Sequence, residues 1–228
     1  MKLIDLSQPI FDDCPNCPDH PPVRSEVILT HEQAGWRLEK LTLANHTGSH
    51  VDAPLHKLAG GKSLDDIPLE KWVGMARIAD LRDSTPRLAI GAELLKNRLP
   101  TALQNQIVLL ATGWGQRREK CDEWLRHAPQ LAPDGAEWLE LRHAPQLAPD
   151  GAEWLVSRGV RGVGIDHYAV GGDRTHEILL GHDVWIVEEL KFPPEVFEVR
   201  QPFQFWALPI NLKGHTGAFC RPVAVVEA

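Results

Sequence analysis

Four side chains that can bind a metal or move a proton fall close together in the stretch NHTGSHVDAPLH, residues 45–56, of a chain with 11 histidines in all. They are His46, His50, Asp52 and His56. Imidazole nitrogens and carboxylate oxygens are ligands of divalent metal ions, and a free imidazole can act as a general acid or base. Gly48 and Pro54 interrupt regular structure, so the stretch is predicted to be a strand that runs into a loop.

The spacing within this stretch predicts which side chains meet. In an extended segment, residues two apart point to the same side, which brings His50 and Asp52 together. Glycine permits the backbone angles of a tight turn, so a turn at Thr47–Gly48 would place His46 beside them. The hypothesis is a divalent metal site, and active sites do favour strand ends. The alternatives are a solvated polar loop and an N-terminal helix cap.

The surrounding segments predict how these residues are positioned. Runs rich in β-formers or apolar residues predict strands, and helical patterns predict helices. The predicted strands are 25–30, 38–44, 75–81, 106–112, 160–166, 184–190 and 203–210, and the predicted helices are 91–99, a segment around 117–126, and 175–181. For the last helix, Thr175 is the expected N-cap and Gly181 the expected C-terminal stop. Strands interleaved with helices predict an α/β fold with a mostly buried sheet.

Composition narrows the class of protein. The chain has 228 residues, 43% hydrophobic and 24% charged, which fits one globular domain over residues 1–228. The net charge is −7 and the basic residues are scattered, which argues against nucleic acid or an anionic membrane as the partner. The longest apolar runs, such as 107–111, are too short to span a bilayer, and the first residues lack a signal-peptide pattern. A cytoplasmic location is therefore expected.

A tandem duplication interrupts the second half of the chain. The sequence LRHAPQLAPDGAEWL stands at 125–139 and again at 141–155, identical over 15 residues and offset by 16. Two copies are too few for a solenoid, and the prolines in them exclude one continuous helix. We expect one copy to fill the position of a helix and the other to lie as a surface excursion.

Cys14 and Cys17 form a CPNCP stretch that superficially suggests a redox pair or a zinc site. A redox pair needs its first thiol near a helix N-terminus, whereas these prolines favour an irregular loop. A zinc site would need a second CxxC. Both cysteines are therefore predicted to be reduced loop residues.

The first stretch also has a specific resemblance to a known family. HTGSHVDAPLH resembles the HxGTHxDxPxH signature of the cyclase family of metal-dependent hydrolases, with Ser49 in place of the usual threonine. That family includes bacterial kynurenine formamidases and isatin hydrolases. The similarity continues in LSQPIFDDCPNCPDHPPV, VRGVGID and HEILLGHDVWIVEEL, and so extends over most of the chain. It implies a swivelling β/β/α-type fold and a homodimer or homotetramer.

The resemblance further implies a role for each residue of the site. The implied ligands are His46, His50 and Asp52 for a first metal, and Asp52, His176 and Glu188 for a second. Asp52 would bridge the two metals, and His56 would be the catalytic acid or base. The implied cofactor is zinc at two ions per site, with manganese as the alternative. Chemistry gives separate support, because Glu188 ends the apolar run VWIVE, where a carboxylate is costly unless it is paired or bound to a cation.

Two reactions and one non-catalytic role are compatible with such a site. The first is arylformamidase-like hydrolysis of N-formyl-L-kynurenine to L-kynurenine and formate by metal-activated water. The second is ring opening of a cyclic amide or imide, as in isatin hydrolases, with a single manganese. Two metals per site favour the first reaction and one metal favours the second. The third is a metal-stabilised binding protein, against which the free His56 argues, because a structural metal site is closed.

Departures from the family pattern concern the substrate rather than the metal. His167 stands where kynurenine formamidases have a threonine, Thr216 stands near an aspartate position, and Cys17 replaces a tryptophan of the pocket wall. The sequence therefore predicts an intact metal centre, a small-molecule substrate and an altered substrate wall.

Overall fold

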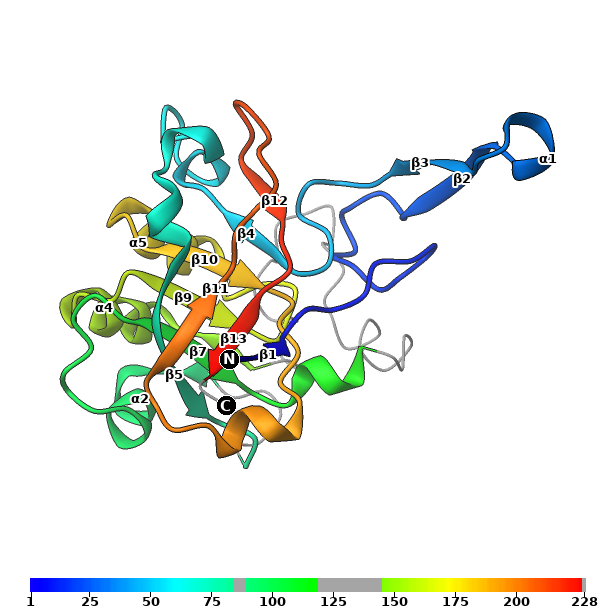
Figure 1. Ribbon diagram of the computed structural model, residues 1–228. Coiled ribbons are helices and arrows are strands. Elements are labelled where there is room, and N and C mark those ends of the chain that lie inside the picture. Colours follow the sequence, from blue (N-terminus) through cyan, green and yellow to red (C-terminus); the bar gives the residue numbers. More distant parts are fainter. Residues whose placement is uncertain (84–88, 119–144, 227–228) are drawn as a thin grey trace.

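The computed structural model describes residues 1–83, 89–118 and 145–226, and Figure 1 shows a main body with one projecting arm. Within these residues nine strands form one mixed sheet. In spatial order they are β1 (Lys2–Asp5), β13 (Val223–Val226), β11 (Phe203–Trp206), β5 (Val73–Asp80), β7 (Ile107–Ala111), β9 (Gly162–Ile165), β10 (Trp185–Glu188), β4 (His50–Asp52) and β12 (Gly217–Phe219). The four central strands β5, β7, β9 and β10 are parallel, and the pairs toward both ends are antiparallel.

The central strand β7 contributes to two hydrophobic cores. Ile107, Leu109 and Ala111 lie in one core, and Val108 and Leu110 lie in the other. Because successive side chains of a strand point to opposite faces, a strand covered on both sides must be apolar throughout. The sequence IVLLA therefore fits only the middle of a covered sheet.

Helices cover one face of this sheet (Figure 1). The longer described helices are α2 (Ala92–Arg98), α4 (Pro149–Ser157) and α5 (Asp173–Gly181). Leu95, Leu155 and Leu179 of these helices are fully buried against the sheet. Short 3-10 helices lie in the connections: η1 (Pro54–His56), η2 (Leu64–Asp66), η3 (Leu69–Trp72), η4 (Trp114–Arg117) and η5 (Pro194–Glu198). None of the described helices has the length and apolar character that a bilayer crossing requires.

The other core is enclosed by the sheet itself. Val51 of β4 and Ala218 of β12 come from one end of the strand order, and Phe205 of β11 and Ala224 of β13 come from the other. All four share a core with the central strands, so the sheet curls around it. The predicted α/β fold with a mostly buried mixed sheet is confirmed.

The predicted elements agree with the structure except at one helix start. A strand overlaps each of the seven predicted strand ranges, and α2 lies within the predicted helix 91–99. Helix α5 ends at Gly181 but begins two residues before Thr175, with Gly172 as its N-cap. Thr175 as the N-cap is therefore wrong, because its hydroxyl donates a hydrogen bond to the Leu147 carbonyl at 2.8 Å instead. The helix predicted around 117–126 lies mostly outside the described residues.

The second copy of the duplication packs into the fold. Its residues form β8 (Gln146–Leu147), which pairs with β6 (Ala89–Ile90), and the start of α4. Pro149 occupies the first turn of α4, where a proline costs no hydrogen bond. The first copy, 125–139, lies outside the described residues.

The arm consists of residues 24–42 and projects away from the body (Figure 1). It contains β2 (Arg24–Leu29), α1 (His31–Ala34) and β3 (Leu38–Thr42), and the two strands pair with each other in a separate antiparallel sheet. Its exposed apolar side chains are Val27, Ile28, Trp36, Leu38 and Leu41. An isolated two-stranded hairpin is at best marginally stable in water, and this one is bonded at its base to the preceding loop, where the Ser25 N–H and hydroxyl both donate to Asp12 Oδ1 at 2.7 Å.

Candidate metal centre

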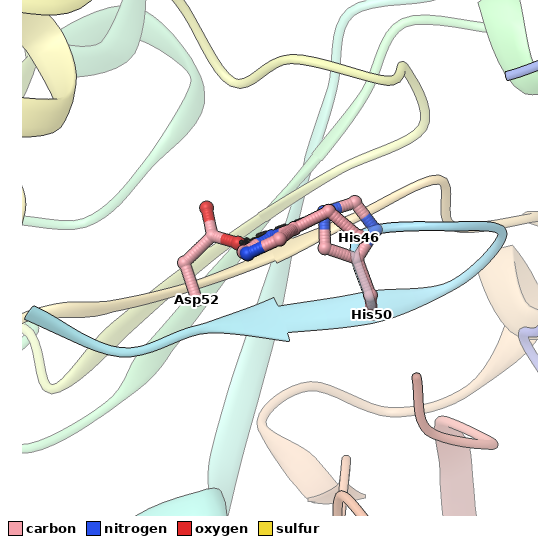
Figure 2. A group of neighbouring side chains, drawn as sticks. All are labelled: His46, His50 and Asp52. Atoms are coloured by element: carbon pink, nitrogen blue, oxygen red, sulfur yellow. Dashed lines mark hydrogen bonds and ion pairs between the residues drawn. The ribbon is translucent and has the colours of Figure 1, made fainter. Parts of the chain in front are cut away.

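Strand β4 carries two of the predicted ligands. His50 and Asp52 point to one side of the strand (Figure 2), while Val51 between them is fully buried in the core that the sheet encloses. In the antiparallel pairing of β4 with β10, His50 lies directly opposite Glu188. Strand pairing therefore places a carboxylate from a distant part of the sequence beside these two residues.

His46 joins them through the predicted turn. Gly48 has φ of +60°, a backbone conformation that favours glycine, and a Cβ at this position would lie 2.7 Å from the Ile10 side chain. After this turn, His46 Nδ1 lies 2.8 Å from Asp52 Oδ1, and His50 Nε2 lies 3.5 Å from the same oxygen. Figure 2 shows the three side chains gathered around that point.

Helix α5 supplies the remaining predicted ligand. His176 Nε2 lies 3.4 Å from Glu188 Oε1 and 3.9 Å from Asp52 Oδ2. Two groups of ligand atoms result, each with its atoms within 4.8 Å of one another. One group is His46, His50 and Asp52, and the other is Asp52, His176 and Glu188. The structure thus brings all five predicted ligands together, with Asp52 in both groups.

Backbone carbonyls orient the imidazoles toward the carboxylates. Nδ1 of His50 lies 2.8 Å from the Gly48 carbonyl oxygen, and Nδ1 of His176 lies 3.1 Å from that of Gly172. A carbonyl only accepts hydrogen bonds, so Nδ1 carries a proton in both rings. Each Nε2 is left to face the carboxylates, which is the arrangement of metal-binding histidines.

The electrostatics of the cluster reflect its density of charge. Burial alone would lower the pKa of His50 and His176, but the hydrogen bond to Glu188 and the charges of Glu188 and Asp52 outweigh it and raise both pKa values to about 9. Burial would raise the pKa of Asp52 and Glu188, yet the neighbouring imidazoles hold the pKa of each carboxyl below its ordinary value. The protonated imidazoles of His50 and His176 therefore supply positive charge beside the two carboxylates, a charge that a metal cation could supply instead.

A divalent cation fits this donor set. Asp52 Oδ2 is buried and has no hydrogen-bond partner among the described residues. Asp52 and Glu188 are only 1% and 4% exposed, and buried carboxylates are costly unless they are paired or bound to a metal. Three nitrogens and two carboxylates are ligands that zinc and similar metals use.

His56 lies beside the ligands without belonging to either group. Its ring centroid is 4.1 Å from that of His46 and 6.1 Å from that of His176. Burial lowers the pKa of His56 by more than the Asp52 carboxylate raises it, and the His46 and His176 imidazoles add to the lowering. A neutral imidazole at this position can accept a proton near pH 7.

Ser49, the one departure within the signature, keeps the function of its hydroxyl. Its Oγ donates a hydrogen bond to the Glu189 carbonyl at 2.6 Å and accepts one from the Gln8 backbone N–H at 2.8 Å. The hydroxyl therefore ties the first strand connection to the end of β10. A threonine methyl adds nothing to these two bonds.

The predicted substrate-wall residues divide between two places. Thr216 Oγ1 lies 2.8 Å from His46 Nε2, so this residue belongs to the metal centre. Cys17 packs instead with Trp114 and Tyr168, and the Tyr168 ring lies 4.1 Å from that of His167. Cys17 and Cys14 are unpaired, as predicted, and burial is the main cause that raises the pKa of the Cys17 thiol to about 11.

His20 is a neighbour of the centre that sequence reasoning missed. Its ring centroid lies 6.5 Å from that of His46. It stands 26 residues before His46 in a proline-rich loop, where no local periodicity indicates which way its side chain points. Its residue type was the only signal that could have found it, and eight of the 11 histidines lie outside the signature.

Comparison with known proteins identifies the family of this chain. The family model Cyclase, described as "Putative cyclase", matches residues 4–171. The chain belongs to the cyclase family. A kynurenine formamidase of Bacillus mycoides (strain KBAB4) is 28% identical to this cyclase-family chain over 97% of it and 96% of that protein.

Solved structures give the same fold to the whole chain. Isatin hydrolase A from Labrenzia aggregata superposes with a TM-score of 0.80 at 22% identity and covers 100% of this chain and 94% of that one. A structure described as a potential metal-dependent hydrolase with cyclase activity superposes with a TM-score of 0.72 at 24% identity, over 98% and 96% of the two chains. These likenesses confirm the fold of this cyclase-family member.

Proposed function

We propose that this protein is a metal-dependent hydrolase that cleaves the C–N bond of an N-formyl arylamine such as N-formyl-L-kynurenine. The observation that carries the proposal is a pair of ligand groups sharing Asp52, with the histidine His56 beside them but outside both. Full-length similarity to a kynurenine formamidase of B. mycoides supports the substrate class.

The proposed cofactor is zinc, with manganese as the alternative. His46, His50 and Asp52 would hold one ion, and Asp52, His176 and Glu188 would hold a second. When bound, such ions lower the pKa of water and polarise a carbonyl group.

His56 carries the proton transfers in this proposal. Water adds to the formyl carbon and the C–N bond breaks, which gives formate and the free arylamine. His56 takes a proton from the attacking water and returns one to the leaving nitrogen, a role that its lowered pKa supports. The His56 ring packs beside that of His46, with their centroids 4.1 Å apart.

The experiment that tests the proposal combines metal analysis with a hydrolysis screen. The protein is loaded with zinc or manganese, and N-formylkynurenine, isatin and simple imides are offered as substrates. Two metals per chain with formamide hydrolysis support the proposal. One metal with ring opening of isatin supports the alternative, a cyclic amide or imide hydrolase. No hydrolysis of any compound by the loaded protein contradicts both reactions and favours a non-catalytic binding protein.

We also infer that a second copy of this chain covers the arm, in a homodimer or homotetramer. Within the described residues the two strands of the arm pair only with each other, and the apolar side chains of the arm are exposed. A cytoplasmic location is proposed as well, supported by the unpaired Cys14, Cys17 and Cys220, since disulfides are rare in reducing compartments.

A further inference from the structure

The loop between β1 and the arm carries an imidazole that belongs to neither ligand group. His20 lies at the end of this loop, its ring makes a hydrogen bond to the His46 backbone, and its titratable neighbours are His46, His50 and Glu188. All three belong to the metal centre, so the His20 ring lies at its edge. At 6.5 Å from the His46 ring, it is further from the ligands than His56, at 4.1 Å.

A buried arginine fixes the start of this loop. Arg118 donates hydrogen bonds from its guanidinium to the carbonyls of Pro9 and Pro15, both at 2.8 Å. Its Nε lies 2.8 Å from Glu189 Oε2, and both side chains are almost fully buried. Since Glu189 follows the ligand Glu188, the arginine joins the loop to the strand end that carries the metal centre.

A second bond fixes the loop to the signature stretch. Asn16 Nδ2 donates to Thr47 Oγ1 at 2.9 Å, and Thr47 follows the ligand His46. Closer to the histidine, the His20 backbone N–H donates to the Cys17 carbonyl at 3.0 Å. Asn16 and Arg118 thus tie the loop of His20 to Thr47 and Glu189, each of which is next to a proposed ligand in the sequence.

One ring nitrogen of His20 lacks a partner. Nδ1 is buried from solvent and has no hydrogen-bond partner among the described residues. A buried polar atom without a partner costs free energy, and in native proteins such atoms commonly mark a functional contact or a site for water. At the edge of a catalytic centre, the partner that completes this atom can be a bound substrate.

We propose that His20 is a substrate-binding residue whose Nδ1 forms a hydrogen bond with a polar substituent of the amide substrate, away from the scissile bond. The inference rests on the proposed hydrolase function. The scissile carbonyl must lie at the ligand groups, and His20 is set back from them, so it reaches a different part of the substrate.

The test compares two substrates that differ in polar substituents, N-formyl-L-kynurenine and N-formylaniline. In the metal-loaded His20→Ala variant, kcat/KM for N-formylkynurenine should fall about 10-fold, mainly through KM, as expected for the loss of one hydrogen bond. Turnover of N-formylaniline should not change, since it lacks a partner for Nδ1. His20→Asn keeps a polar atom near the position of Nδ1 and should recover part of the loss.

The controls separate binding from folding. His182→Ala removes an exposed imidazole at the end of α5 and should leave both substrates unaffected. Loss of Nδ1 itself should not lower thermal stability, because this atom has no partner in the free protein, so any loss of stability in His20→Ala comes from the hydrogen bond between the ring and the His46 backbone. Equal losses with both substrates would indicate a structural role and overturn the inference, as would no loss with either. If the wild-type protein hydrolyses neither substrate, the proposed function fails, and the inference fails with it.

Discussion

Asp52 at the metal centre is 1% exposed, whereas Trp36 and Leu41 on the arm are 67% and 61% exposed. One region buries charged groups and the other exposes apolar ones, the reverse of what each residue type favours. Buried carboxylates need a cation, and exposed apolar side chains need a covering surface. The first region fits the proposed metal site, and the second fits the proposed contact with another copy of this chain.

The two regions also differ in how they are supported. The metal centre stands on β4, β10 and α5, which pack on two cores of the body. Every residue of β3 on the arm is exposed, and β2 is nearly so. Substitutions at the metal centre should change turnover without unfolding the protein. Substitutions on the arm should change the oligomeric state without changing turnover.

The largest expected effect is on turnover. His56→Ala should lower kcat by about 10²–10⁴-fold, because it removes the proposed proton carrier, and should leave the metal content unchanged. Steady-state kinetics with metal analysis by mass spectrometry measure both quantities, with His182→Ala as the control. Loss of metal or of folding together with activity would instead assign His56 to the structural part of the centre.

The next effect is a dependence of metal binding on pH. His50 and His176 have pKa values of about 9 in the folded protein, above their ordinary value of 6.5. Without metal, their protonated forms stabilise the fold fully below pH 6.5, and this stabilisation is lost as the pH rises toward 9. With metal, both must lose the proton that competes with the ion, so binding tightens by up to roughly 10-fold per proton per pH unit.

The measurement is the difference in melting temperature between metal-loaded and metal-free protein. This difference should widen from pH 6.5 to 9. If the difference in melting temperature stayed constant over that range, metal binding would not displace protons from His50 and His176.

A smaller effect is expected at the arm. Trp36→Ser and Leu41→Ser should shift the protein toward the monomer, since each apolar side chain contributes about 1.5–3 kcal/mol when it is covered. Sedimentation at several concentrations measures the association, and Lys40→Ser on the same strand is the matched control. A wild-type protein that sediments as a monomer would contradict the proposed contact.

The smallest effect is expected from shortening the duplication. A chain without residues 125–140 retains 145–157, which supply β8 and α4, so its melting temperature should stay close to that of the full chain. Calorimetry of the two chains measures this. A large loss of stability would show that the first copy contributes to the fold.

The sequence predicted the local half of the metal centre better than the distant half. His46, His50 and Asp52 lie within seven residues, so the two-residue period of a strand and one glycine turn suffice to bring them together. Glu188 meets them only because β10 pairs with β4 in one particular register. Register depends on packing over the whole sheet, so Glu188 and His176 were predicted through family resemblance.

The misses have the same origin. Thr175 was expected to cap α5, but its hydroxyl bonds to Leu147, which arrives from another segment of the chain. His20 was missed because its orientation depends on the bonds that Arg118 and Asn16 make to distant residues. The exposure of the arm was not predicted either. Alternating apolar residues give the same sequence pattern whether the surface that packs on them belongs to this chain or to another.

Arg118 has one more consequence, which concerns how such a chain can lengthen during evolution. It is held by Pro9, Pro15 and Glu189, and β8 on the far side of residues 119–144 is held by its pairing with β6. Both ends of this connection are thus fixed independently of its length. Lengthening a connection between fixed points costs only about 0.6 kcal/mol per doubling. Residues added between these anchors, such as one copy of the 16-residue repeat, therefore need not move the strand ends that hold the metal centre.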